Sequence, residues 1–130
     1  MRAIDTNMVV RYLTNDDPAQ AARARAAVDG DEVFVPTSIL LKSEWVLRSG
    51  GYGFTADCIL EALRDFACLP TVTLENPRCV ERAFEWARAG LDFADALHLS
   101  SARGCREMLR FDRRFAKVAA RISDIKVVTI

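Results

Sequence analysis

Four carboxylic acids are spread along the chain, each with apolar neighbours in the sequence: Asp5, Glu44, Asp95 and Asp112. A charged side chain that becomes buried among such neighbours destabilises a fold unless another group balances it, so the four acids need a common explanation. Carboxylate oxygens are the ligands that hard divalent cations prefer, and a cation relieves the repulsion between crowded carboxylates. We therefore interpret the four acids as a shared divalent-metal site.

The elements that must position these acids follow from two alternating periodicities. Short β-prone runs predict strands at residues 2–4, 33–35, 71–74, 108–111 and 126–129. The segments between them have helical spacing and predict helices at residues 7–13, 18–28, 36–49, 55–67, 77–89, 93–103 and 113–122. This order predicts a single α/β domain over residues 1–130, with a mainly parallel central sheet flanked by helices.

Three of the acids are expected at helix starts. Asp5 and Asp112 directly follow predicted strands, where open parallel sheets bind ligands, and Asp95 lies in the first turn of a predicted helix. An Asp at such a position also acts as an N-cap, worth about 0.5 to 2 kcal/mol, and Asp92 is expected to cap in the same way. Capping explains each aspartate separately, but it predicts no convergence with Glu44.

Glu44 is expected in the middle of a helix, where capping cannot place it. Its neighbours at helical spacing are Leu40, Leu41, Leu47 and Arg48. The side chain therefore projects from a largely apolar surface. The alternative to a metal ligand is an ion pair with Arg48 at the i,i+4 spacing, worth about 0.3 to 0.5 kcal/mol.

Composition limits the class of protein. The chain has 130 residues, 51% of them hydrophobic, which fits one globular domain. Basic and acidic residues both number 18, so affinity for a polyanion depends on where the charges lie. The sequence has no membrane-length apolar run and opens without a signal peptide, so we expect a cytoplasmic protein. The four cysteines lack zinc-site spacing and are expected to be free, mostly buried thiols.

The motifs that carry the four acids resemble, in order, those of PIN-domain ribonucleases, and most closely the VapC-type toxins of bacterial toxin–antitoxin pairs. The resemblance runs from residue 1 to residue 130. The motifs are residues 5–7 (DTN) after the opening strand, Glu44 in the second major helix, residues 93–98 (FADALH) and residues 111–115 (FDRRF).

This resemblance implies a PIN-like fold and a metal-dependent endoribonuclease. It places the acidic quartet on the four acids named above, with Thr6 or Asn7 as support, and implies Mg²⁺ or Mn²⁺ as cofactor. It further implies a small antitoxin partner that blocks the site, and a homodimer. One position departs from the pattern, because Arg110 stands where the family often has Thr or Ser. A supporting hydroxyl is therefore missing beside Asp112, which puts direct ligation by Asp112 in question.

In-line hydrolysis of an RNA phosphodiester is the reaction that such a site would catalyse, because a bound metal activates water and offsets charge on the leaving oxygen. We expect Asp5 and Asp95 to hold the main ion directly. Glu44 and Asp112 are expected to act through water, on a second ion, or in orienting the nucleophile.

Substrate binding requires cations, and residues 103–121 contain seven basic residues against two acidic ones. Such a segment can steer a phosphate backbone, although charges of this kind also simply solvate a helix face. Single-stranded or looped RNA is the expected substrate. The expected RNA contacts are Arg11, Arg110, Arg113 and Arg114.

Two other functions stay open. An aspartyl-phosphate phosphatase or receiver-like domain also places an Asp after its first strand, but here Thr6 and Asn7 follow Asp5 in place of a second acid, and no strand ends in Lys. A nonenzymatic RNA- or protein-binding PIN-like module would keep the fold and lose the chemistry. Arg110 is the residue that points to this second alternative.

Overall fold

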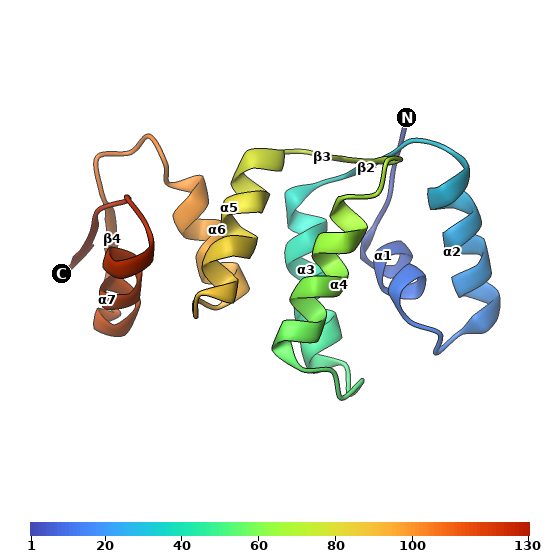
Figure 1. Cartoon of the computed structure of the whole chain (residues 1–130), viewed down its shortest axis with the longest axis horizontal. Coiled ribbons are helices and arrows are strands. Elements are labelled where there is room, and N and C mark those ends of the chain that lie inside the picture. Colours follow the sequence, from blue (N-terminus) through green and yellow to red (C-terminus); the bar gives the residue numbers. More distant parts are fainter. The chain divides into compact units, whose positions relative to one another are not determined.

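Short parallel strands alternate with longer helices along the chain, as Figure 1 shows for the computed structural model of residues 1–130. The strands are β1 (Arg2–Ala3), β2 (Val33–Val35), β3 (Val72–Leu74), β4 (Met108–Arg110) and β5 (Val127–Thr129). The helices are α1 (Thr6–Leu13), α2 (Pro18–Gly30), α3 (Thr37–Ser49), α4 (Ala56–Ala67), α5 (Pro77–Arg88), α6 (Phe93–Ser101) and α7 (Arg113–Ile122). The chain forms two units, Met1–Pro77 and Arg78–Ile130, each with its own sheet.

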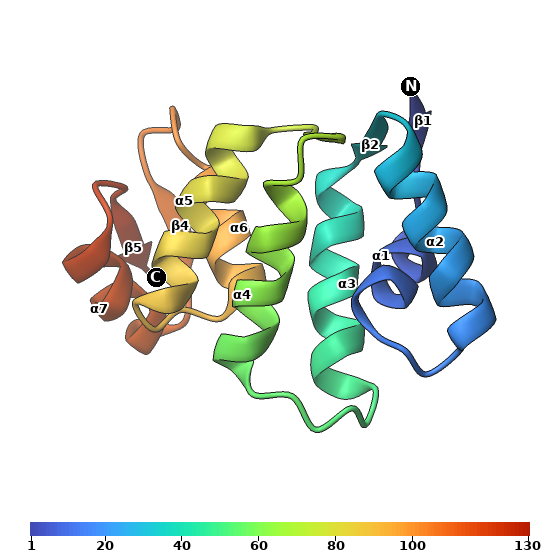
Figure 2. The same ribbon diagram turned by 45° about the vertical axis from the view of Figure 1, so that its right-hand side comes forward.

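The first unit is built on a three-stranded parallel sheet in the order β1-β2-β3. Arg2 pairs with Val33, and Val33 pairs in turn with Val72, so β2 is the central strand. Parallel neighbours need crossover connections, which are supplied here by α1 with α2 and by α3 with α4. Helix α3 packs against α1 and α4 (Figures 1 and 2). The largest fully buried side chains of this unit include Val9, Val28, Leu40, Leu63 and Phe66.

Carboxylates begin two helices of the first unit in different ways. The Asp17 side chain caps α2 by accepting a hydrogen bond from the Gln20 backbone N–H. Helix α3 follows Pro36 and has no capping side chain of its own. Glu75, directly after β3, accepts from the Thr37 backbone N–H at 3.0 Å instead. The end of β3 therefore helps to fix the start of α3.

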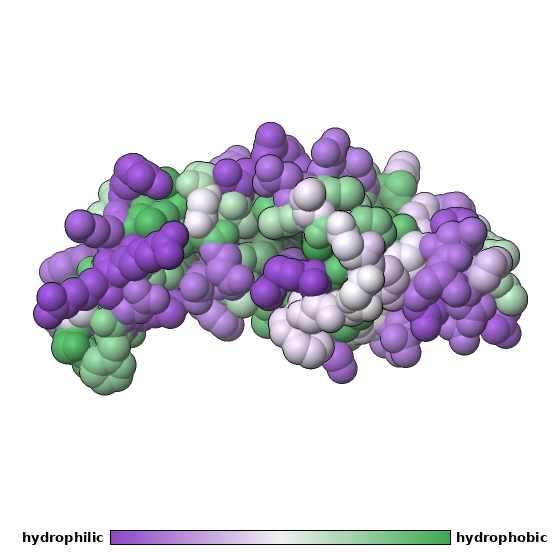
Figure 3. Space-filling model, turned by 90° about the horizontal axis from the view of Figure 1, so that it is seen from below, coloured by the Kyte–Doolittle hydropathy of each residue, from purple (hydrophilic) through white to green (hydrophobic).

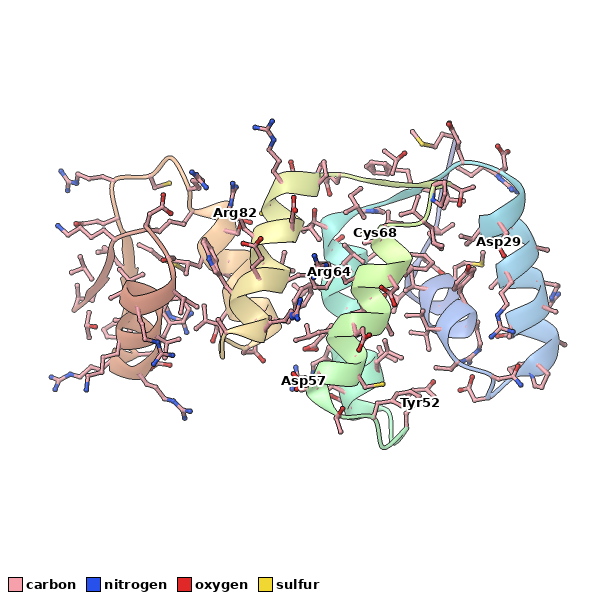
Figure 4. The ribbon with its side chains drawn as sticks, in the orientation of Figure 1. Asp29, Tyr52, Asp57, Arg64, Cys68 and Arg82 are labelled. Atoms are coloured by element: carbon pink, nitrogen blue, oxygen red, sulfur yellow. The ribbon has the colours of Figure 1, made fainter.

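Asp16 joins two loops of the first unit. Its carboxylate accepts hydrogen bonds from the Thr14 and Tyr52 hydroxyls, both at 2.9 Å, and pairs with Arg11 at 3.1 Å. Tyr52 lies in the loop that joins α3 to α4 (Figure 4), whereas Asp16 lies between α1 and α2. The hydrogen bonds from Thr14 and Tyr52, followed by the charge of Arg11, lower the pKa of Asp16.

The second unit contains a two-stranded parallel sheet, in which Met108 of β4 lies opposite Val127 of β5. Helix α7 is the crossover between these strands. Ser100 ties α6 to α5, because its hydroxyl donates to the Cys79 carbonyl at 2.9 Å and accepts from Arg82 Nε at 3.3 Å. Arg82 is labelled on α5 in Figure 4.

Gly90 separates α5 from α6 in a backbone conformation that favours glycine, with φ of +123°. The turn brings the Phe84 and Phe93 rings together at a centroid distance of 5.1 Å. Both rings are buried, as is Trp86. These aromatic residues of α5 and α6 therefore belong to the core of the second unit.

The predicted elements are all present, and their ends differ from the predicted ends by at most two residues. The parallel α/β class is confirmed. The strands lie in two sheets, one in each unit, where a single central sheet was expected. None of the helices combines the length and the hydrophobicity that crossing a bilayer requires.

The expectation that the cysteines are mostly buried is wrong. All four are free thiols, but Cys58, Cys68 and Cys105 are exposed and Cys79 is partly exposed. Position explains two of these: Cys68 follows the last residue of α4 (Figure 4), and Cys105 lies in the loop before β4. Helix ends and loops place side chains at the surface more often than helix centres do.

Trp45 lies outside the core, since 56% of it is exposed. The buried stripe of α3 consists of Leu40, Ser43, Glu44 and Leu47. Trp45 lies one position beyond Glu44 and so is turned by about 100° from that stripe. Figure 3 shows other apolar side chains reaching the surface as separate patches on a largely hydrophilic face.

Candidate functional site

Asp5 begins α1 at the carboxyl end of β1. Its Oδ1 accepts a hydrogen bond from the Met8 backbone N–H at 3.1 Å, which confirms the predicted capping role. Asp5 is exposed, whereas Thr6 beside it is buried and Asn7 is exposed. Capping uses one carboxylate oxygen, so the second oxygen remains available to a ligand.

A cavity of about 670 Å³ lies along β1 and beside Asp5. Within the first unit, strand β1 pairs with β2 on one side only. Arg2, Arg23 and Asn7 line the cavity together with Asp5. The Arg2 and Arg23 guanidinium groups make no ion pair. The sequence gives no local signal for this grouping, because the fold brings β1 and α2 together.

Arg11 also lines this cavity, but its guanidinium group is already engaged. Its Nη1 donates to both oxygens of Asp16 at 3.1 Å, and its Nε donates to Gln20 Oε1 at 2.8 Å. The charge of Arg11 is therefore balanced within the first unit. A contact between Arg11 and RNA stays a prediction.

Glu44 lies on the buried face of α3, and only 6% of the residue is exposed. The expectation that it projects from an apolar surface is confirmed. Arg48 Nε donates to its two oxygens at 3.1 and 3.2 Å, so the alternative i,i+4 pair is also present. The ion pair explains how the first unit accommodates a buried carboxylate.

Asp92, and not Asp95, caps α6. The Asp92 carboxylate accepts from the backbone N–H groups of Ala94 and Asp95 at 3.0 and 3.3 Å. This confirms Asp92 as the cap and leaves the Asp95 side chain free for another role. Asp95 uses its carboxylate to accept a hydrogen bond from Arg110 Nη1 at 2.9 Å.

Asp112 begins α7 directly after β4 and accepts from the Phe115 backbone N–H at 3.0 Å. The Arg110 guanidinium carbon lies 4.0 Å from the centroid of the Phe115 ring. Arg110 thus contacts the Asp95 carboxylate and also stacks on the residue that Asp112 caps. The sequence marked Arg110 as unusual because of its place before Asp112, but the ion pair that it forms is with Asp95.

Arg113 and Arg114 occupy the first turn of α7, immediately after Asp112. Both are exposed, and neither guanidinium group forms an ion pair. They are therefore available to an anionic ligand close to Asp112. Their predicted contact with RNA is consistent with this exposure and stays a prediction.

The four predicted ligands offer a donor set that suits a hard divalent cation, because every donor is a carboxylate oxygen. Asp5 and Glu44 belong to the first unit, and Asp95 and Asp112 to the second. Neither unit by itself gathers three or more acidic, histidine or cysteine side chains around one ion. A shared metal site for the four acids stays a prediction.

Sequence comparison identifies the class of protein. The model of the PIN domain family matches residues 3–121, a range that includes all four acids. The chain belongs to the PIN domain family, whose members are typically nucleases that use divalent metals.

Among solved structures, the chain is similar to VapC20 of Mycobacterium tuberculosis, described as a toxin that cleaves the sarcin–ricin loop. The two share 18% sequence identity with a TM-score of 0.44, over 96% of this chain and 98% of that one. No curated protein matches the sequence.

Proposed function

We propose that this protein is an endoribonuclease that depends on Mg²⁺ or Mn²⁺ and serves as the toxin of a type II toxin–antitoxin pair. Membership of the PIN domain family, with acids at the starts of α1 and α7 and in the first turn of α6, is the observation that carries the proposal. In this proposal the protein would act in the cytoplasm, on an RNA substrate and under the control of an antitoxin.

In this proposal Asp5 and Asp95 hold the metal ion, and Glu44 and Asp112 support it through water or a second ion. When bound, the ion would lower the pKa of a water molecule and offset negative charge on the phosphodiester. The chain's own cations would hold the RNA, with Arg113 and Arg114 facing solvent beside Asp112. Thr6, which is buried and directly follows Asp5 in the sequence, would support that carboxylate.

The proposal also includes a homodimer and a small antitoxin that covers the site. Support comes from large apolar side chains that remain at the surface. Phe111 is 81% exposed directly before Asp112, and Leu109 of β4 is also exposed. In the first unit, Trp45 and Phe54 are exposed in the same way. Large apolar side chains that are exposed close together, as Leu109 and Phe111 are in the sequence, commonly mark contacts between proteins.

The first experiment compares two N-cap substitutions, Asp5→Asn and Asp17→Asn. Both aspartates accept one hydrogen bond from a backbone N–H at 3.1 Å, and Asn caps helices about as well as Asp. Both variants should therefore fold like the wild-type protein. With Mn²⁺ and total RNA, Asp5→Asn should cleave on the order of 100-fold more slowly, because loss of a ligand costs at least as much as loss of a supporting group. Asp17→Asn should cleave at the wild-type rate.

The outcomes separate the candidate functions. Cleavage that requires Mn²⁺ or Mg²⁺ and disappears in Asp5→Asn supports the nuclease. RNA binding without any cleavage, in the presence of either metal, would instead favour the nonenzymatic module. Equal cleavage by Asp5→Asn and the wild-type protein would show that Asp5 is not a metal ligand.

A further inference from the structure

We propose that Arg110 is an internal counter-cation of the metal site: it occupies the Asp95 carboxylate in the metal-free protein, and a divalent ion must displace it. This inference rests on the proposed function and deepens it. It assigns Arg110 a role that a Thr or Ser hydroxyl at the same position could not perform, because a hydroxyl carries no charge.

The geometry shows an arginine that is held in place. Arg110 Nη1 lies 2.9 Å from Asp95 Oδ1, and the two side chains are only 24% and 30% exposed. By contrast, the Arg103–Asp124 and Arg106–Glu107 pairs of the same unit are 3.7 and 3.9 Å long, and both of these arginines are exposed. The Arg110–Asp95 contact is therefore the shorter and better shielded ion pair.

Phe115 fixes the guanidinium group from a second side. Its ring lies 4.0 Å from the Arg110 guanidinium carbon, a distance at which cation and ring attract each other. The Phe115 backbone N–H is itself bonded to Asp112. Arg110 is consequently held by two contacts, the ion pair with Asp95 and the stacking on Phe115.

The positive charge of Arg110 determines its effect on metal binding and on RNA binding. A divalent ion that binds Asp95 must break the ion pair or accept a positive charge close by, and either outcome weakens metal binding. A guanidinium group has five N–H donors, of which one is used on Asp95. Once displaced, it can turn these donors to a phosphate oxygen of the RNA. Arg110 would therefore oppose the metal and assist the substrate.

Substitution of Arg110 by Met tests the first half of this role. Met removes the charge and keeps an unbranched stem that can pack on Phe115. We expect Arg110→Met to bind Mn²⁺ about tenfold more tightly than the wild-type protein, measured without RNA from the electron paramagnetic resonance signal of free Mn²⁺. Arg110→Lys should stay close to the wild-type affinity because it keeps a positive charge.

The matched control is Arg78→Met, which removes the same charge from an exposed position on α5. It should leave Mn²⁺ affinity within about twofold, because an exposed charge away from the site is largely screened. In the Asp95→Asn background, Arg110→Met should have little effect, because the carboxylate through which Arg110 acts is gone.

RNA binding tests the second part of this role, in which Arg110 assists the substrate, and here the substitution should weaken affinity. The ligand is a fluorescent 12-nucleotide single-stranded RNA at saturating Ca²⁺, and the RNA is shown to be intact after the measurement. Arg110→Met should bind this RNA about fivefold more weakly than the wild-type protein does, because Met cannot donate a charge-assisted hydrogen bond to phosphate. A merely structural role for Arg110 would lower both affinities together.

Equal Mn²⁺ affinity for Arg110→Met and the wild-type protein, or weaker binding by the variant, would overturn the proposal. This result can be told apart from failure of the proposed function. In one case, the wild-type protein cleaves RNA while Arg110→Met leaves the Mn²⁺ affinity unchanged. The protein would then be a nuclease without an internal counter-cation. In the opposite case, Arg110→Met binds Mn²⁺ more tightly but no variant cleaves RNA. That result would support Arg110 as a counter-cation and would reject the proposed nuclease function.

Discussion

At the scale of single residues, Glu44 and Arg48 form a pair whose two members are very differently buried. The Glu44 side chain is 7% exposed and the Arg48 side chain 46%. When one partner of an ion pair is removed, the cost depends mainly on whether the charge left behind is buried. The two single substitutions should therefore have unequal effects on stability.

We expect Glu44→Gln to lower the free energy of unfolding by about 1 kcal/mol, because it leaves behind an arginine that water can reach. Arg48→Met should cost about 2 kcal/mol, because it leaves a buried carboxylate and also removes the other interactions of Arg48. Urea denaturation at pH 7 measures both values. A larger loss in Glu44→Gln than in Arg48→Met would contradict this view of the pair. If Glu44 also supports the metal, Glu44→Gln alone should abolish Mn²⁺-dependent cleavage while the protein stays folded.

At the scale of elements, the loops after α1 and α3 depend on one carboxylate. Asp16 accepts hydrogen bonds from Thr14 and Tyr52, which together with the charge of Arg11 lower its pKa below the ordinary value of 3.8. A carboxyl group with a lowered pKa in the folded state contributes stability above its unfolded pKa. That contribution is lost as the pH falls through the folded value.

The resulting prediction concerns stability in acid. Between pH 7 and pH 5 the wild-type protein should keep a constant contribution from Asp16, and below about pH 4 it should lose that contribution. Asp16→Asn should be less stable at pH 7, and the difference from the wild-type protein should shrink as the pH falls below 4. Urea midpoints measured from pH 7 to pH 2.5 give the comparison, with Asp57→Asn, an exposed acid in the first turn of α4, as control. A difference that is the same at every pH would show that the charge of Asp16 does not matter.

The elements themselves were largely predictable because local signals specify them. Pro18 and Pro77 stand at the first positions of α2 and α5, and Asp5, Asp92 and Asp112 cap the helices that they were expected to cap. Each signal acts within a few residues. For this reason the bounds of helices and strands could be predicted without knowledge of the tertiary structure.

Contacts between distant residues could not be predicted in this way. Arg110 was recognised as unusual, but its ion pair with Asp95 depends on how α6 and β4 pack. The contact of Glu75 with the start of α3 spans 38 residues. The burial of Glu44 was predictable, because helical spacing alone shows that its neighbours are apolar. Whether the four acids hold one ion stays a prediction.

At the scale of the whole molecule, the neutral total charge conceals an uneven distribution. Residues 1–77 contain 7 basic and 11 acidic side chains, for a net charge of −4. Residues 78–130 contain 11 basic and 7 acidic side chains, for a net charge of +4. A polyanion is attracted by the second unit and repelled by the first. Affinity for RNA should therefore depend on which cations are removed and not on the net charge alone.

Two double charge reversals of equal size distinguish these possibilities. Arg113→Glu with Arg114→Glu changes the second unit, and Lys42→Glu with Arg64→Glu changes two exposed positions of the first. The first pair should weaken binding of a single-stranded RNA by tenfold or more. It should also lower the slope of log affinity against log salt concentration by about 1.4, at about 0.7 for each phosphate that is no longer neutralised. The second pair should leave that slope unchanged, because neither residue is expected to bind a phosphate. Equal weakening in both variants would mean that total charge controls RNA binding and that α7 is not the RNA-binding element.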